Sequence, residues 1–257
     1  MRILSIDLDY IMGPSIKKYE NSYWNDNASS RWSNFFRFNT EGIKENDLPF
    51  DKGHLFYLFK LFNKCLHAGT EVSFAYDHDN ILYSIGDKTD LEIINVDHHH
   101  DVLYHGDMIH PDLYPDKTRS VKGNKHDYHH IKNSHDVDEG NWIAYLRTQN
   151  RVKSYTWITN EHAIADLDDN DLKYYQGLIP KMRVTTKEEY DIMDYHFDHM
   201  HLCLSPQYIP PVHWHLYTLF LISYETYTGK KVDLGEIGNK KFEMSIRHLN
   251  VTNEILH

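Results

Sequence analysis

Several residues that can bind metal ions or move protons stand together in Asp97-His98-His99-His100-Asp101, directly after an apolar run. Residues 91–96 are typical of a strand that is buried on both faces. Because side chains alternate along extended backbone, Asp97, His99 and Asp101 would turn to one side. Two carboxylates and an imidazole on one side suit a divalent cation such as Mn²⁺. The alternative is a polar strand end with solvated histidines.

Two further apolar segments end in residues of the same kind. Residues 2–8 predict a strand that carries Asp7 and Asp9 on one face, and residues 71–76 predict a strand followed by Asp77-His78-Asp79. Carboxylates at the end of an apolar strand are costly unless they are paired or bound to a cation. The three clusters together contain enough ligands for two metal ions about 3.5–4 Å apart, which can activate a shared water for hydrolysis.

The elements that would position these residues alternate along the chain. Further strands are predicted at residues 154–158 and 200–206, and helices at residues 51–68, 141–146 and 211–227. This alternation predicts one α/β domain over residues 1–257, with a mostly parallel sheet. Ligands of such sheets bind at the carboxyl ends of the strands. Residues 15–50 are expected to form a long, partly irregular insertion, and the His-rich residues 112–139 a surface loop.

Composition excludes several classes of protein. The 257-residue chain is 40% hydrophobic and 14% aromatic, which is enough for a packed core, so it is not a disordered protein. Its net charge of −11 argues against nucleic acid as a partner and favours basic substrates. Cys65 and Cys203, without a CxxC motif, predict buried thiols in a reducing compartment. With no membrane-length apolar run and no signal-peptide pattern, we expect a soluble cytoplasmic protein and no membrane partner.

The three clusters resemble the metal-binding motifs of the arginase (ureohydrolase) superfamily. In that family the strand similar to Ser5-Ile6-Asp7-Leu8-Asp9 comes last rather than first, which looks like a circular permutation. A closer resemblance is to the peptide arginases. The matching segments are Asp7-Leu8-Asp9-Tyr10, Asp77-His78, Asp97-His98-His99-His100-Asp101, Asn141-Trp142 and Ser205-Pro206-Gln207-Tyr208-Ile209-Pro210.

The resemblance implies a three-layer αβα sandwich that binds two Mn²⁺ per chain. His78 and Asp101 would hold one ion and His99 and Asp9 the other, with Asp97 and Asp7 as bridges. Asp101 would also orient the attacking water. The implied reaction converts an arginine side chain, in a ribosomally made precursor peptide, to ornithine with release of urea. Free arginine is a poorer expectation, because Leu103 and Ile143 replace an asparagine and a histidine of the free-arginine enzymes.

The substrate contacts are less closely specified by the resemblance. Asp79, Glu139 and Ser205 are candidates to bind the guanidinium group or act as acid or base, and each could instead be a turn or cap residue. Asn141, Trp142, Ser205 and Tyr10 are candidates for substrate binding, although Trp142 could instead belong to the core. Asp77 is expected to orient His78. Residues 19–36 and 112–139 are expected to contact the peptide.

Three other functions fit part of the pattern. Val96-Asp97-His98-His99 also resembles the Asp-His-His class of phosphodiesterases, but the chain is acidic and lacks their glycine-rich loop. A deacetylase of the arginase-like fold would need only one Zn²⁺ and would leave Asp7, Asp9 and His78 in excess. A non-enzymatic metal-binding protein would have no open coordination position. A homo-oligomer stays open.

Overall fold

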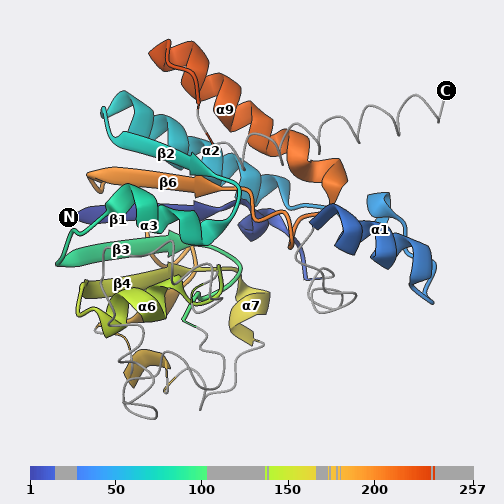
Figure 1. Ribbon diagram of the computed structural model, residues 1–257, viewed down its shortest axis with the longest axis horizontal. Helices are drawn as coiled ribbons and strands as arrows, with labels where there is room; N and C mark the ends of the chain where they lie inside the picture. Colours follow the sequence, from blue (N-terminus) through green and yellow to red (C-terminus); the bar gives the residue numbers. More distant parts are fainter. Residues whose placement is uncertain are drawn as a thin grey trace.

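The computed structural model describes residues 1–14, 28–102, 137, 139–165, 173, 175–177, 179, 181–232 and 234. Six strands form one sheet in the order β2-β6-β1-β3-β4-β5, and every neighbouring pair is parallel (Figure 1). The strands are β1 (Arg2–Asp7), β2 (Glu71–Ala75), β3 (Leu91–Val96), β4 (Val152–Ile158), β5 (Arg183–Thr185) and β6 (His199–Cys203).

Helices cover both faces of this sheet, which confirms the predicted three-layer αβα sandwich. The α-helices are α1 (Ala28–Phe38), α2 (Lys52–His67), α3 (Ile81–Ile85), α6 (Trp142–Thr148), α7 (Glu161–Ala165) and α9 (Trp214–Thr228). Helices α2 and α9 lie together on one side of the sheet, while α3 and α6 lie on the other (Figure 1). The rings of Phe59 and Phe220 stack between α2 and α9 at 4.1 Å. None of the described helices is both long and apolar enough to cross a membrane.

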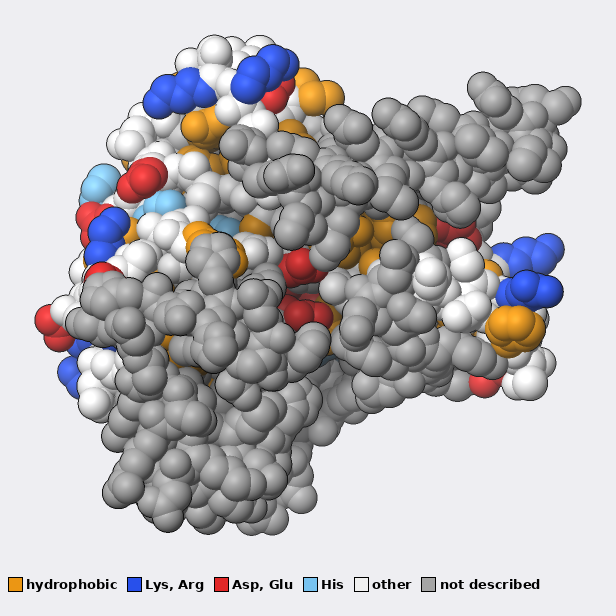
Figure 2. Space-filling view, viewed as in Figure 1, with side chains coloured by type: hydrophobic (Ala, Val, Ile, Leu, Met, Phe, Trp, Pro, Cys, Tyr) orange, Lys and Arg blue, Asp and Glu red, His pale blue; other side chains and the backbone are white. Residues whose placement is uncertain are grey.

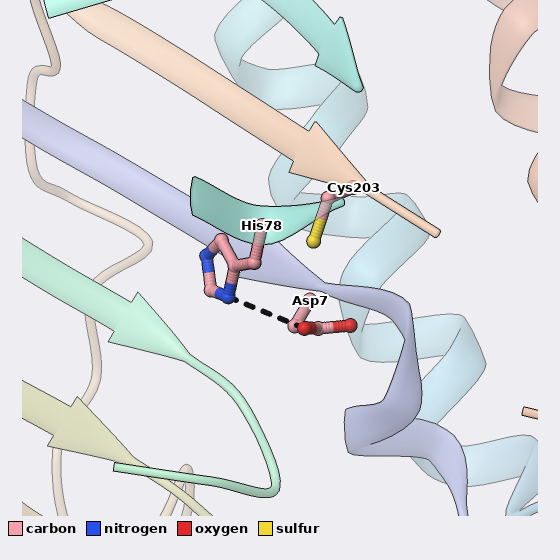
Figure 3. A group of neighbouring side chains, drawn as sticks. All are labelled: Asp7, His78 and Cys203. Atoms are coloured by element: carbon pink, nitrogen blue, oxygen red, sulfur yellow. Dashed lines mark ion pairs between the residues drawn. The ribbon is translucent and has the colours of Figure 1, made fainter. Parts of the chain in front are cut away.

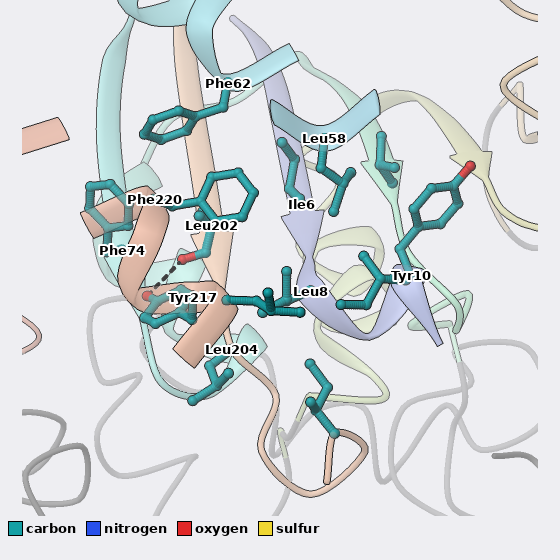
Figure 4. Packing of buried hydrophobic residues seen from close by; sticks show 14 of the residues in the cluster. Ile6, Leu8, Tyr10, Leu58, Phe62, Phe74, Leu202, Leu204, Tyr217 and Phe220 are labelled. Atoms are coloured by element: carbon teal, nitrogen blue, oxygen red, sulfur yellow. Dashed lines mark hydrogen bonds between the residues drawn. The ribbon is translucent and has the colours of Figure 1, made fainter. Parts of the chain in front are cut away.

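The two faces of the sheet differ in chemistry. Toward α2 and α9, the strands present apolar side chains such as Ile6, Phe74 and Leu202, which pack into one core cluster (Figure 4). A second apolar cluster, which includes Ile3, Ile93 and Trp142, lies on the opposite side. This opposite face also carries a polar row, because the strand register aligns Ser73 with His201, His201 with Ser5, and Ser5 with Asn95. Since side chains alternate along a strand, one face can be wholly apolar while the other keeps buried polar groups.

The predicted elements are found with small shifts, and three features differ from the sequence-based expectation. The long insertion includes helix α1, whose Trp32 and Phe35 are buried in the core and therefore are not exposed peptide contacts. Short strand β5 was not predicted. The helix predicted from residue 211 begins as a 3₁₀ turn, η4 (Pro211–His213), before α9. Tyr19, Tyr23 and Trp24 lie outside the described residues, as does the His-rich segment 112–136.

Candidate metal centre

Side chains from all three predicted clusters meet at one edge of the sheet. Asp7 ends β1, His78 begins a 3₁₀ turn after β2, η3 (His78–Asn80), and Asp97 follows β3. Because β1, β2 and β3 belong to one parallel sheet, their carboxyl ends lie at the same edge. Asp7, Asp9, His78, Asp97 and Asp101 are at most 3% exposed, and the His99 side chain is 25% exposed. The alternative of a strand end with solvated histidines does not fit His98, which is 5% exposed.

His78 faces three carboxylates. Its Nδ1 lies 3.2 Å from Oδ2 of Asp7, 3.2 Å from Oδ2 of Asp97 and 3.0 Å from Oδ2 of Asp101. It is nevertheless not aligned for a hydrogen bond to any described residue. The other ring nitrogen, Nε2, lies 2.6 Å from the hydroxyl oxygen of Ser5. If Nε2 donates its proton to Ser5, the Nδ1 lone pair points at the carboxylates, which is the arrangement of a metal ligand.

A second group lies next to the first and shares one residue with it. His99 Nδ1 is 2.7 Å from Oδ2 of Asp9 and 4.0 Å from Oδ1 of Asp97. The two oxygens of Asp97 therefore face different histidines. Ligand atoms of Asp9, Asp97 and His99, and those of His78, Asp97 and Asp101, each lie within 4.8 Å of one another. Each group could hold a metal ion, and Asp97 belongs to both groups.

The electrostatics of the metal-free site also favour a cation. Burial, together with the charges of Asp7 and Asp97, raises the pKa of Asp9. Burial and the charges of Asp101 and Asp7 likewise raise the pKa of Asp97. Burial would lower the pKa of His78, but the neighbouring carboxylates Asp101 and Asp7 help to raise it well above its ordinary value. So many buried acids close together repel one another unless protons or metal ions neutralise them.

Three outer side chains hold the carboxylates in place. Asn95 Nδ2 donates to Oδ2 of Asp97 at 2.9 Å and to Oδ2 of Asp101 at 3.2 Å. Trp142 Nε1 donates to Oδ2 of Asp101 at 2.7 Å, and the Ser205 hydroxyl donates to Oδ2 of Asp7. Trp142 and Ser205 were candidates for substrate binding, with a core role as the alternative for Trp142 and a turn or cap role for Ser205. The structure places both side chains among the buried residues that support the carboxylates, at no more than 1% exposed.

The backbone does not follow the predicted extended course. Asp9 lies in a 3₁₀ turn, η1 (Leu8–Ile11), whose first residue is preceded by Asp7; the Asp7 side chain accepts from the Asp9 N–H. Residues 97–101 bend, and Asp101 adopts a left-handed φ of 53°. The carboxylates therefore converge through turns, and the expected alternation of side chains along an extended strand is wrong at these positions.

A small cavity opens beside the centre. Its volume is about 50 Å³, and the described residues that line it are Asp7, His99, His100, Asp101, Glu139, Gly140 and Tyr208. This space corresponds to one or two water molecules or ions. Figure 2 shows acidic side chains gathered in a hollow near the middle of this face of the molecule.

Glu139 is the predicted substrate-contact residue that reaches this cavity. Asp79 is 1% exposed and is not among the described lining residues. Tyr10 is fully buried against the ring of His54, 4.6 Å away, and Asn141 is also fully buried. Tyr10 and Asn141 thus lie in the interior and are not among the described lining residues. Asp77 accepts from Gln207 Nε2 at 3.2 Å, and so it contacts the loop after β6.

Cys203 belongs to the centre but was not predicted there. It ends β6 directly beside Asp7 on β1, and its sulfur lies within 4.8 Å of ligand atoms of Asp7 and His78 (Figure 3). Alternation along His199-Met200-His201-Leu202-Cys203 could have placed the cysteine on the polar face. Cys65, in α2, is buried and free, as is Cys203, in agreement with the predicted thiols.

The site thus combines buried carboxylates, two histidines and a thiol at the carboxyl edge of a parallel sheet. These groups could hold a metal ion. Neither a protein-family model, nor a curated protein, nor a solved structure matches the chain.

Proposed function

We propose that this protein is a hydrolase with two metal ions that converts arginine side chains in a peptide to ornithine and urea. The observation that carries the proposal is the position of Asp97. One of its oxygens faces His78 and the other faces His99, and each histidine has further carboxylates beside it. A carboxylate shared in this way is what a pair of ions needs to lie close enough to act together.

Two Mn²⁺ ions are the expected occupants of the centre. Carboxylate and imidazole ligands suit Mn²⁺. When bound, such a pair of ions polarises the substrate and makes a water molecule more acidic and more nucleophilic. A deacetylase with a single Zn²⁺ would leave the second group without a bound ion. That group consists of Asp9, Asp97 and His99.

The cavity supports a cationic substrate group. Three carboxylates, from Asp7, Asp101 and Glu139, line it, and no lysine or arginine is among its described lining residues. This charge attracts a guanidinium group and disfavours a phosphodiester. In the proposed reaction, water adds to the guanidinium carbon and the bond from that carbon to the ornithine nitrogen breaks. That nitrogen takes up a proton, and urea leaves.

The test is to measure metal content and urea release on the same preparations. The chain is purified without chelator, its metals are measured by plasma mass spectrometry, and it is then incubated with Mn²⁺ and an arginine-containing peptide. We expect two ions per chain. The peptide product should be lighter by the mass of urea minus the mass of the water molecule that is consumed. Asp97→Asn should lose both metal binding and activity, because the amide cannot carry the shared negative charge.

Asp90→Asn provides the matched control. Asp90 is exposed and lies just before β3, outside the described metal groups. It should keep both metal and activity. A fully active, metal-loaded Asp97→Asn protein would overturn the proposal, as would a wild-type chain that binds no metal after reconstitution. A chain with one Zn²⁺ that releases acetate from acetylated amines would instead identify a deacetylase.

A further inference from the structure

The end of strand β6 adds a sulfur atom to one half of the metal centre. Asp7 and Cys203 are aligned in the β1–β6 register, so both side chains project from the same face at the ends of neighbouring strands. Figure 3 shows the sulfur of Cys203 on the same side as the Asp7 carboxylate and the His78 ring. Cys203 is fully buried.

The distances suit a shared ion. Zinc lies about 2.3 Å from a thiolate sulfur and about 2.0–2.2 Å from nitrogen or oxygen, so two ligand atoms of one ion are at most about 4.5 Å apart. The ligand atoms of Asp7, His78 and Cys203 lie within 4.8 Å of one another. Small side-chain adjustments would bring these atoms to coordination distance.

Two independent observations indicate that this group is built for a ligand. First, His78 Nδ1 is buried and has no aligned hydrogen-bond partner among the described residues, although it faces the site. Second, Ser205 contacts two members of the group at once. Its hydroxyl donates to Asp7 and lies 3.4 Å from the sulfur of Cys203, which orients a carboxylate and a thiol toward the same space.

We propose that Cys203 is a thiolate ligand of the ion on the His78 side of the centre. The inference rests on the metal centre of the proposed function, but it does not depend on arginine as the substrate. It makes the centre unsymmetrical. The His78 half offers sulfur, nitrogen and oxygen, whereas the His99 half offers nitrogen and the oxygens of Asp9 and Asp97.

The chemical consequence is a difference in metal preference between the halves. Thiolate ligands select Zn²⁺ and Co²⁺ over Mn²⁺, while carboxylate and imidazole ligands accept Mn²⁺. The His78 half should therefore bind Zn²⁺ or Co²⁺ more tightly than Mn²⁺ when these metals compete, whereas both halves bind Mn²⁺ when it is the metal supplied, as in the proposed function. A preparation supplied with both metals is expected to contain one of each.

The test is the absorption spectrum of the cobalt-loaded protein, because a sulfur bound to Co²⁺ gives an intense charge-transfer band in the near ultraviolet. We expect the band in the wild-type chain and in the control variant Cys65→Ser. Cys65 is the other cysteine of the chain and lies on α2, in the hydrophobic core. Cys203→Ser should lack the band. Its affinity for Zn²⁺ should fall at least about tenfold, while its affinity for Mn²⁺ changes less than about twofold.

Each outcome has a distinct meaning. Wild-type protein that binds Co²⁺ without the band would overturn the thiolate assignment and leave the two-metal proposal standing. A band that persists in Cys203→Ser would also overturn the assignment, because the sulfur would then come from elsewhere. No bound metal at all would instead overturn the proposed function. If Cys203→Ser does not fold, the test is ¹¹³Cd NMR of the cadmium-loaded wild-type protein. Sulfur ligation moves the ¹¹³Cd resonance strongly downfield, so a resonance without this shift would overturn the assignment.

Discussion

The indole Nε1 of Trp142 donates a 2.7 Å hydrogen bond to Oδ2 of Asp101, and the same oxygen lies 3.0 Å from His78 Nδ1. Trp142 is fully buried at the start of α6. A core side chain therefore fixes the direction of a candidate metal ligand. Packing of α6 against the sheet and the geometry of the centre are in this way coupled.

Trp142→Phe tests this coupling. Phenylalanine keeps most of the buried apolar surface but removes the donor to Asp101, so the protein should fold and bind metal about 10–100-fold more weakly. The measurement is a competition titration with a metal-sensitive dye. Trp214→Phe is the matched control, since Trp214 is also buried and its Nε1 donates to the carbonyl of Ile209, which belongs to none of the described metal groups. Equal metal affinity in both variants would contradict the role of Trp142.

Glu139→Gln tests which acid meets the substrate. Glu139 lines the cavity, whereas Asp79 is 1% exposed and does not appear in the described lining. Removing a charge that pairs with a guanidinium group is expected to lower kcat/KM for an arginine peptide about 10–100-fold, at about 1.4 kcal/mol for each factor of ten. Metal content should stay unchanged. If Asp79→Asn instead gives the selective loss, the two acids must be reassigned.

The metal-free protein should lose stability as the pH rises above about 6.5, the ordinary pKa of a histidine. Burial and neighbouring carboxylates raise the pKa of Asp9 from 3.8 to about 8 and that of Asp97 from 3.8 to about 7. Between about pH 6.5 and pH 8 the folded state therefore holds more protons than the unfolded state, so the free energy of unfolding falls as the pH increases. Below this range, buried histidines such as His100 and His201, whose pKa values burial lowers, act in the opposite direction. His78, whose pKa is also raised, contributes with the same sign above its ordinary value of 6.5.

This dependence is measured as Tm between about pH 7 and pH 9, in chelator and in excess Mn²⁺. Bound ions need deprotonated ligands, so Mn²⁺ should raise Tm more at the higher pH. A Tm of the chelated protein that rises through this window would show that the buried acids are already neutralised in another way.

Arg31→Met tests how α1 supports the loop after β6. Arg31 is buried, donates to the carbonyl of Gln207, and lies over the ring of Tyr208. Methionine fills similar space but cannot donate a hydrogen bond. The free energy of unfolding, measured with urea, should therefore fall by about 1.5–3 kcal/mol. Arg37→Met, on an exposed position of the same helix, should change stability by less than about 0.5 kcal/mol. Equal stability of both variants would contradict the anchoring role.

The sequence alone was sufficient to predict every strand of the sheet except β5, and the polar residues that follow three of those strands. Apolar runs that end in Asp7, His78 and Asp97 predicted strands followed by ligands, and parallel strands bring such ends to one edge. Local patterns carry this information, because strand burial and the cost of a buried charge are properties of short segments.

The geometry of the turns and the hydrogen bonds that hold the carboxylates could not be predicted from local sequence patterns. The expected extended course of residues 97–101 failed, because Asp101 adopts a left-handed φ that a pattern of residue types does not reveal. Trp142 and Ser205 were candidates for substrate binding, yet their polar atoms hold Asp101 and Asp7. A tryptophan or serine has the same identity in either role, and its neighbours decide between them.

Cys203 shows most clearly what only the tertiary structure decides. It lies 196 positions from Asp7 in the chain, and the order β2-β6-β1-β3 makes the two neighbours. Strand order depends on which long crossover connections pack best around the whole sheet, so no local segment encodes it. The sequence by itself determined which residues could bind a metal at each strand end. The folded sheet decided which of those ends meet.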